Sequence, residues 1–178
     1  MSDCKSNLEY NDEAIKLLLD TAISEYNNEH NRTSVIDSKV SISLPIVSAY
    51  FLSLASANDY KLIVEMPIIK FTDGLLMVLL LVSYIFSLIF ALIAVLYLID
   101  AIKTRDYKVI QPSALYDNDY LKFDHKVMSI KLIKLYIEAF ESNKAKNDLR
   151  IPMYSNGWHF TIKSIVLHVI SIILKNFA

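Results

Sequence analysis

The longest apolar run of the chain is an uninterrupted stretch in its middle. From Gly74 to Ile99 the sequence GLLMVLLLVSYIFSLIFALIAVLYLI carries no charged residue. Because a bilayer core of roughly 30 Å is crossed by about 20 apolar residues in a helix, this stretch is long enough for one crossing. A helix that is apolar all round would need complete cover in a soluble domain. The pattern therefore predicts a transmembrane helix over residues 75–99.

A second uncharged stretch, VSISLPIVSAYFLSLASA, covers residues 40–57. Serines dilute it and Pro45 should kink it, but neighbouring helices and serine hydroxyls can satisfy the carbonyl that a proline leaves free in a membrane. We expect it to span the bilayer together with the stronger helix, so that residues 40–99 form a transmembrane hairpin. The alternative is a helix that coats a soluble core.

The carboxy-terminal residues 158–178 contain a third candidate, WHFTIKSIVLHVISIIL over residues 158–174. A lysine at the bilayer centre costs roughly 2.5 to 3.5 kcal/mol, but Lys163 lies near the start and can extend its ammonium group to the headgroups. We expect a third span, with an interfacial or protein-packed helix as the alternative. His168 is interpreted as a packing residue, with a proton relay as the alternative.

An amphipathic pattern precedes the hairpin, in residues 1–39. Asn11 is a candidate helix cap, because its side-chain oxygen can accept from a free backbone N–H group of the first turn. Apolar residues then recur at three- and four-residue spacing, which is typical of one helix face. They are Ile15, Leu18, Leu19, Ala22, Ile23 and Tyr26. The pattern predicts a cytoplasmic amino-terminal helix.

A second amphipathic pattern lies in residues 100–157, the expected cytoplasmic helical segment. We expect a helix that begins at Asp117 or Asp119 and ends between Asn143 and Asp148. Its inward face is predicted to consist of Leu121, Val127 or Met128, Leu132, Leu135, Ala139 and Phe140. A single apolar stripe in water is unfavourable, so the two amphipathic helices are expected to pack on each other.

Small residues indicate where the spans approach each other, because the hydrophobic effect does not draw helices together in lipid. Two series have four-residue spacing: Ala49, Ser53 and Ala57 in the first span, and Ser83, Ser87 and Ala91 in the second. An antiparallel hairpin would pair Ala57 with Ser83, Ser53 with Ser87, and Ala49 with Ala91. Contact between copies in an oligomer is the alternative use of these helix-packing candidates.

Basic residues flank both ends of the predicted hairpin, whereas acidic residues offset the lysines between its spans. The flanking residues are Arg32, Lys39, Lys103, Arg105 and Lys108. The basic residues of the segment 100–157 add to this bias: Lys122, Lys126, Lys131, Lys134, Lys144, Lys146 and Arg150. The positive-inside rule then predicts a multi-pass inner-membrane protein with a cytoplasmic amino terminus. The acidic residues 1–39 do not resemble a secretory signal.

The amino-acid composition argues against several classes of function. Hydrophobic residues make up 54% of the 178 residues, and the formal net charge of −1 provides no basic surface for nucleic acid. The two glycines, Gly74 and Gly157, are too few and too far apart for a phosphate-binding loop. The lone cysteine, Cys4, excludes an internal disulfide and a cysteine-based zinc site.

The histidines do not form a catalytic pattern: they are His30, His125, His159 and His168. No HExxH, paired-carboxylate or GxSxG motif is present. We therefore expect no enzyme, and no catalytic, cofactor-binding or metal-binding residue. The expected partners are the lipid bilayer and further copies of the chain.

The order of these parts resembles a known group of membrane proteins. An acidic helix leads into DSKVSISLPIV, and a hairpin, a charged helix ending in ESNKAKND and a terminal hydrophobic segment follow. Five polar residues carry the resemblance: Glu29, Arg32, Asp37, Lys39 and Asn143. The pattern is similar to small membrane effectors of bacterial nucleotide-signalled antiphage systems, of the SLATT type and the Pycsar transmembrane type. It implies membrane disruption after a cyclic-nucleotide or other infection signal.

The chain departs from this group by its expected third span and by the lack of an obvious ligand-binding domain. The resemblance assigns no functional residue. We expect an all-α membrane protein that oligomerises and perturbs or permeabilises the bacterial inner membrane in antiphage defence. A signalling nucleotide or a cytoplasmic sensor protein would be its trigger. The alternative is a non-catalytic accessory or structural membrane subunit that docks a cytoplasmic partner.

Overall fold

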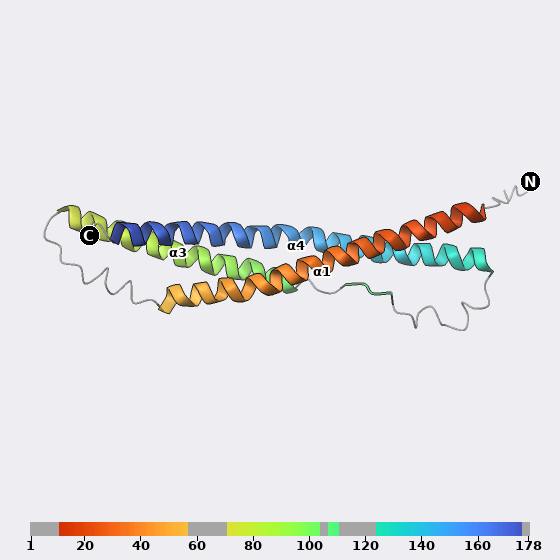
Figure 1. The fold of residues 1–178 in the computed structure, drawn as a ribbon, viewed down its shortest axis with the longest axis horizontal. Helices are drawn as coiled ribbons and strands as arrows, with labels where there is room; N and C mark the ends of the chain where they lie inside the picture. The colour runs from red at the N-terminus through yellow and green to blue at the C-terminus, as the bar shows by residue number, and fades with distance from the viewer. Residues whose placement is uncertain (1–10, 57–70, 104–106, 111–123, 176–178) are drawn as a thin grey trace, which may run out of the picture. The chain divides into compact units, whose positions relative to one another are not determined.

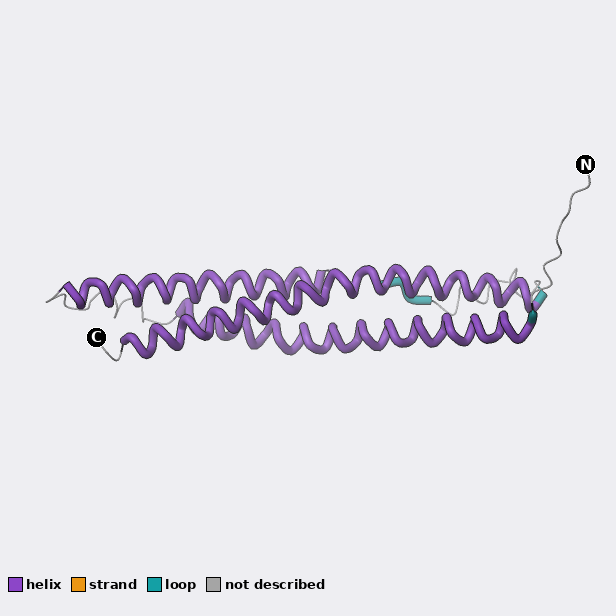
Figure 2. The backbone as a smooth tube through the Cα atoms, turned by 90° about the horizontal axis from the view of Figure 1, so that it is seen from above, coloured by secondary structure: helices purple, strands orange, loops and turns teal. Residues whose placement is uncertain are grey.

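The computed structural model describes residues 11–56, 71–103, 107–110 and 124–175 of the chain. These residues form three long helices, α1 (Asp12–Ser56), α3 (Phe71–Lys103) and α4 (His125–Lys175). Within the described ranges Figure 2 shows helices and short loops but no strand. The expected all-α fold is confirmed. Each helix is long and apolar enough to cross a membrane, which indicates a membrane protein.

The three helices are labelled in Figure 1. The chain divides into two compact units, and α1 and α4 each contribute residues to both. The first unit comprises Met1–Val35 and Asp106–Asn147, and so contains the beginnings of α1 and α4. The second unit comprises Ile36–Arg105 and Asp148–Ala178. It contains the remainder of these two helices and all of α3.

The beginning of α1 confirms the predicted cap. The Asn11 Oδ1 atom accepts a hydrogen bond of 3.0 Å from the Glu13 backbone N–H group. Asp12 and Glu13 occupy the first turn, where negative charge is favourable next to the positive end of the helix dipole. The cap and these charges together explain why the helix begins at this point of the chain.

Two predicted helix boundaries are wrong. The amino-terminal helix and the span over residues 40–57 were predicted as two elements with a boundary at residues 39 and 40, but α1 contains both and passes through Pro45. The change from charged to apolar residues near Val40 alters the surroundings of the helix but contains no residue that stops it. Because Pro45 lies inside the helix, the proline also does not end it in this chain.

The second wrong boundary is the expected helix end between Asn143 and Asp148, through which α4 continues. Asparagine in a helix costs less than about 0.7 kcal/mol relative to alanine, and buried hydrogen bonds of Asn143 and Asn147 offset this cost. The helix begins at His125, just after Asp124, whose carbonyl accepts from the Met128 N–H group at 3.0 Å. The earlier candidates Asp117, Asp119 and Leu121 lie outside the described residues.

In the first unit the beginnings of α1 and α4 lie side by side and run in the same direction. Asp12 pairs with Lys126 at 3.1 Å near the start of both helices. Further along, the ring of Tyr26 meets that of Tyr136 edge to face, with centroids 5.5 Å apart. On the expected stripe of α1 Ile15 and Ala22 are buried, but Leu18 stays exposed.

In the second unit α3 runs antiparallel to its two neighbours. At one end Leu174 of α4 packs against the buried pair Leu80 and Tyr84. At the other end Ala101 of α3 packs with Ile36 and Val40 of α1. A third cluster between these ends joins buried residues of α1 and α3: Val47, Ala94 and Leu98. All three helices therefore share one interior in this unit.

The interior of the second unit is less apolar than its exterior. The buried face of α3 contains Leu80, Ser83, Tyr84, Ser87, Ala91, Ala94, Leu98 and Ala101. Its exposed face carries larger apolar side chains, Leu75, Val78, Leu79, Val82, Ile85, Phe86, Ile89, Leu92 and Leu96. Soluble monomers rarely expose such contiguous apolar surface, so this arrangement fits a lipid environment.

At Gly157 the backbone of α4 lies close to α3. A Cβ atom added at Gly157 would lie 3.0 Å from Cγ and Cδ2 of Leu98 and 3.4 Å from the Ala94 carbonyl oxygen. Small residues allow such backbone approach between helices in a membrane. The glycine is therefore explained by packing.

Replacing Gly157 by valine should destabilise the second unit, because the branched side chain must displace Leu98. Overpacking of this kind costs about 1 to 3 kcal/mol. The thermal unfolding midpoint of the purified protein in detergent should fall for Gly157→Val and stay near the native value for Asn156→Val, a change at an exposed neighbour. Equal midpoints for the two variants would contradict the close approach.

Candidate functional site

Reciprocal serine contacts join α3 to α4 in the second unit. The Ser87 hydroxyl donates to the Ser164 carbonyl at 2.9 Å, and the Ser164 hydroxyl donates to the Ser87 carbonyl at 2.7 Å. Nearer the other end, the hydroxyls of Ser83 and Ser171 lie 2.5 Å apart. All four serines are buried. In hydrocarbon such contacts are worth about 0.6 to 2 kcal/mol each.

Tyrosine hydroxyls connect α1 to the same polar interior. The Tyr50 hydroxyl lies 3.2 Å from the Ser164 Oγ atom, and the Tyr84 hydroxyl donates to the Leu54 carbonyl at 2.6 Å. We call these hydroxyl-bearing residues the hydroxyl seam: Tyr50, Ser83, Tyr84, Ser87, Ser164 and Ser171. Because its hydroxyls bond within the protein, the seam fastens the three helices to one another.

The six helix-packing candidates separate into two groups. Ser83, Ser87 and Ala91 are buried, whereas Ala49 and Ser53 are exposed and Ala57 lies outside the described residues. Instead of the expected pairing of Ser87 with Ser53, the structure pairs Ser87 with Ser164 of α4. The small residues of α4 supply hydroxyl groups and also let its backbone approach α3 closely. The predicted pairing compared only the first two spans, so it did not consider α4 as the partner of α3.

The inward stripe of α1 explains why Ala49 and Ser53 are exposed. The buried positions of this helix in the second unit are Ile36, Val40, Ser43, Val47 and Leu54. Their spacing is that of a helix face from which both small residues are absent. Ala49 and Ser53 therefore form a small-residue surface on the outside of the unit.

The ionisable residues of the third predicted span occupy different places. Lys163 is exposed, and its ammonium lies 5.0 Å from the centroid of the Phe160 ring, a cation–π contact. The half-buried His168 meets the Tyr50 ring edge to face, with centroids 6.4 Å apart. Within the described residues its buried Nδ1 atom has no hydrogen-bond partner. The structure thus supplies the packing contact between His168 and Tyr50.

Arg150 forms buried contacts with Asp37 and Ala101 that were not predicted from the sequence. Its side chain is fully buried in the second unit, where Nε donates to the Ala101 carbonyl at 2.7 Å and the guanidinium pairs with Asp37. Ala101 belongs to the last turn of α3, where a cation is favourable next to the negative end of the helix dipole. One side chain therefore connects all three helices. From the sequence, Arg150 was counted only among the basic residues of the expected cytoplasmic segment.

In the first unit a separate polar cluster surrounds Asn147. Its Nδ2 group donates to the Glu29 carboxylate at 2.5 Å and to the Thr33 hydroxyl at 2.8 Å. Arg32 pairs with the same carboxylate at 3.3 Å. A buried carboxylate would be strongly unfavourable without such partners. The cluster therefore fixes α1 against α4 within this unit.

The short segment 107–110 is held by the same face of α4. The Asn143 amide bonds both backbone groups of Lys108: its Oδ1 accepts from the Lys108 N–H group at 2.9 Å, and its Nδ2 donates to the Lys108 carbonyl at 3.0 Å. The Tyr107 hydroxyl donates to the Asn147 Oδ1 atom at 2.8 Å. Asn143 is thus a packing residue that recognises main chain.

Four of the five residues that carry the resemblance lie in these polar contacts: Glu29, Arg32, Asp37 and Asn143. The fifth, Lys39, is exposed. In the described part of the chain no group of three or more His, Cys, Asp or Glu residues could hold a metal ion. The polar clusters around Arg150 and Asn147 hold the helices together through hydrogen bonds and the ion pair between Arg150 and Asp37.

Comparison of the chain with models of protein families, with curated proteins and with solved structures gives no match in any of the three. Its function is therefore inferred from its own residues and contacts.

Replacing Arg150 by methionine should strongly destabilise the second unit, because the change removes the donor shared by Asp37 and Ala101. Because Asp37 is about one third exposed and can be hydrated after the change, we expect a loss of about 1 to 3 kcal/mol, the range for a polar group that loses its partner. The matched control is Lys39→Met, at an exposed lysine. The double variant Asp37→Leu with Arg150→Met should recover part of the loss in thermal unfolding. If Arg150→Met unfolds no earlier than Lys39→Met, the connecting role is refuted.

Proposed function

We propose that this protein spans the bacterial inner membrane three times and acts as an oligomerising effector that perturbs or permeabilises that membrane in antiphage defence. The apolar exterior of the second unit supports the membrane location. The proposed spans are the hairpin helices within residues 40–57 and 75–99 and a third helix within residues 158–174. The amphipathic helices of the first unit pack on each other on the cytoplasmic side.

The helix directions in the second unit support three crossings. Because α1 and α4 are parallel and α3 is antiparallel to both, the two termini of a spanning chain lie on opposite sides of the membrane. Lys103 at the end of α3 and the basic residues before the first span favour a cytoplasmic amino terminus.

The observation that carries the proposal is the contrast between a closed interior and an open small-residue surface. In one copy the hydroxyl seam is bonded within the protein, so its serines are not free to line a water path. Ala49 and Ser53 are exposed instead, and small residues let a second helix approach closely in lipid. Perturbation of the bilayer therefore requires several copies, which meet at this surface of α1.

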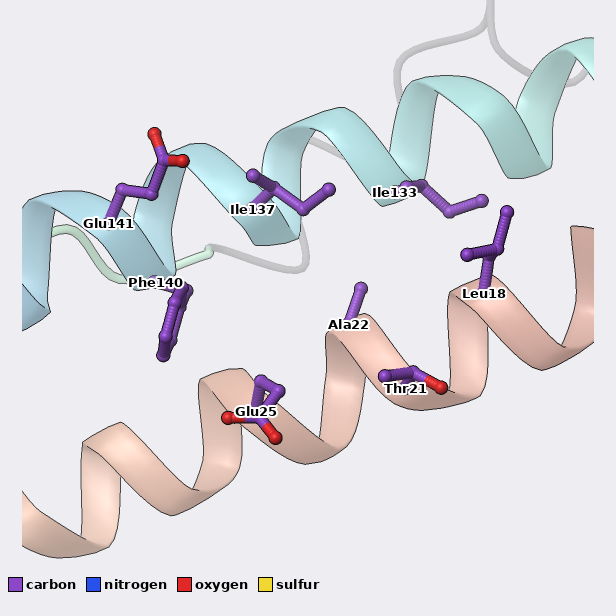
Figure 3. A pocket seen from close by; sticks show the side chains of 8 residues that line it. All are labelled: Leu18, Thr21, Ala22, Glu25, Ile133, Ile137, Phe140 and Glu141. Carbon is purple, nitrogen blue, oxygen red and sulfur yellow. The ribbon is translucent and has the colours of Figure 1, made fainter.

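A second candidate function is an accessory membrane subunit that docks a cytoplasmic partner. One observation favours it, an open groove of the first unit that is lined by Leu18, Ile133 and Ile137 among others (Figure 3). The two functions differ in their effect on the membrane potential, which an effector lowers and an accessory subunit leaves unchanged.

Expression in bacteria with a membrane-potential dye tests the effector function. The native protein should depolarise the membrane on induction or infection. Ser53→Leu should weaken contact between copies by about 1 kcal/mol, roughly fivefold, and reduce both cross-linked oligomer and depolarisation while the unfolding midpoint stays unchanged. Ser87→Leu should instead lower the midpoint, because Ser87 is buried against α4.

The matched control is Ile46→Leu, which keeps size and polarity at another exposed position of α1. It should behave like the native protein. A normal potential during both induction and infection, with the protein present in the membrane fraction, would contradict the effector function and support the accessory subunit.

A further inference from the structure

Lys163 is a charged residue on the apolar exterior of the second unit. It is exposed, and so are its neighbours Ile162, Ile165 and Val166, which are 54%, 43% and 51% exposed. Lys163 is also the only lysine, arginine, aspartate or glutamate in residues 158–174, the proposed third span. An ammonium group that faces lipid is unfavourable unless it reaches water or an anion. The position of this ammonium group therefore matters for the crossing.

The Lys163 side chain extends toward the beginning of α4. Its ammonium lies 5.0 Å from the centroid of the ring of Phe160, a residue one turn nearer the amino-terminal end of the helix. Helix side chains tilt in this direction, and the face of an aromatic ring attracts a cation. The charge is therefore held closer to the beginning of the proposed span than the Lys163 backbone is.

The contacts of the Phe160 ring place this ammonium near the border of the apolar surface. The ring stacks on that of Tyr97 in α3, with centroids 5.6 Å apart and planes at 10°. Tyr97 precedes Asp100 by about 4.5 Å along the helix, and tyrosine is enriched at membrane–water interfaces. Asp100 pairs with Lys103 at 3.6 Å, and both side chains are more than half exposed. The ammonium of Lys163 therefore lies near the level at which lipid headgroups begin.

The anion that a bilayer offers at this level is the phosphate of a phospholipid. Among the described residues no carboxylate pairs with Lys163, and Asp100 already has Lys103 as its partner. The phosphate of phosphatidylcholine lies beside the cation of its own headgroup, whereas phosphatidylglycerol carries no cation. A lysine near the membrane surface therefore favours an anionic phospholipid, by roughly a factor of five per charge.

We propose that Lys163, held over the Phe160 ring, binds the phosphate of an anionic phospholipid at the border where α4 enters the membrane. In the proposed orientation this border lies in the cytoplasmic leaflet. The lipid site rests on the proposed third crossing, and it does not require that the protein is an effector. A lipid bound there fixes the depth of α4 relative to the headgroups.

The test measures which lipid contacts this surface of the full chain in liposomes. Trp158→Phe removes the single tryptophan of the chain, and Val166→Trp supplies a fluorescent reporter. Val166 is exposed and follows Lys163 by three residues, so it shares the same helix face. The liposomes contain equal amounts of phosphatidylglycerol and phosphatidylcholine, one of which is brominated in its acyl chains. Because bromine quenches tryptophan only at short range, the ratio of quenching by the two lipids gives their relative affinity.

Phosphatidylglycerol should bind the reporter protein about fivefold more tightly than phosphatidylcholine. Lys163→Gln should bring the two lipids to equal affinity, whereas Lys163→Arg, which keeps the charge, should keep the preference. The matched control is Lys144→Gln in the same reporter protein. Lys144 is also an exposed residue of α4 with its ammonium 5.5 Å from the centroid of a phenylalanine ring, but it belongs to the first unit. Its replacement should leave the preference unchanged.

Four results would overturn the proposal: equal affinity of the two lipids for the reporter protein, an unchanged preference in Lys163→Gln, an equal loss in the Lys144→Gln control, or loss of the preference in millimolar inorganic phosphate. The last result would identify a free anion as the ligand. Equal quenching by both lipids would refute the lipid site alone. Absence of quenching by either lipid would refute the third crossing as well, so the two failures are distinguishable.

Discussion

The apolar exterior of the second unit is the constraint on which the rest of the structure depends. Leucine, isoleucine, valine and phenylalanine cover its outer faces, while serine, threonine, glycine and alanine take much of the interior. This distribution is unfavourable in water, where contiguous apolar surface drives association. In hydrocarbon it is favourable, since the helices satisfy their own backbone groups and the interior hydroxyls satisfy one another. The membrane location and the packing of the helices both follow from it.

The sequence revealed those parts of the fold that depend on neighbouring residues. The uncharged run over residues 75–99 lies within α3, and Asn11 caps α1 as predicted. The continuity of α1 and α4 was missed because composition changes along both helices without a residue that stops them. A change in hydropathy along a helix indicates whether water or lipid surrounds it. It does not mark the residue at which the helix ends.

The contacts between segments far apart in the chain were harder to predict from the sequence. Ser83, Ser87 and Ala91 were identified as packing residues, but Ser83 and Ser87 form hydrogen bonds to α4 rather than to the first span. The inward stripe of α4 consists largely of polar and small residues, such as Arg150, Gly157, Thr161 and Ser164. A search for apolar periodicity therefore finds the opposite face of this helix. The buried contacts of Arg150 were not predicted for the same reason.

The central claim is that lipid surrounds the second unit, and measuring how deep its exposed residues lie in a bilayer tests this most directly. In a Cys4→Ser background, spin labels at Val82 and Ile165, two exposed positions of the second unit, and at Asp20 report collisions with oxygen and with a water-soluble nickel chelate in liposomes. Lipid burial of the second unit predicts frequent oxygen and rare nickel collisions at Val82 and Ile165, and the reverse at Asp20. Equal nickel access at all three positions would contradict the account.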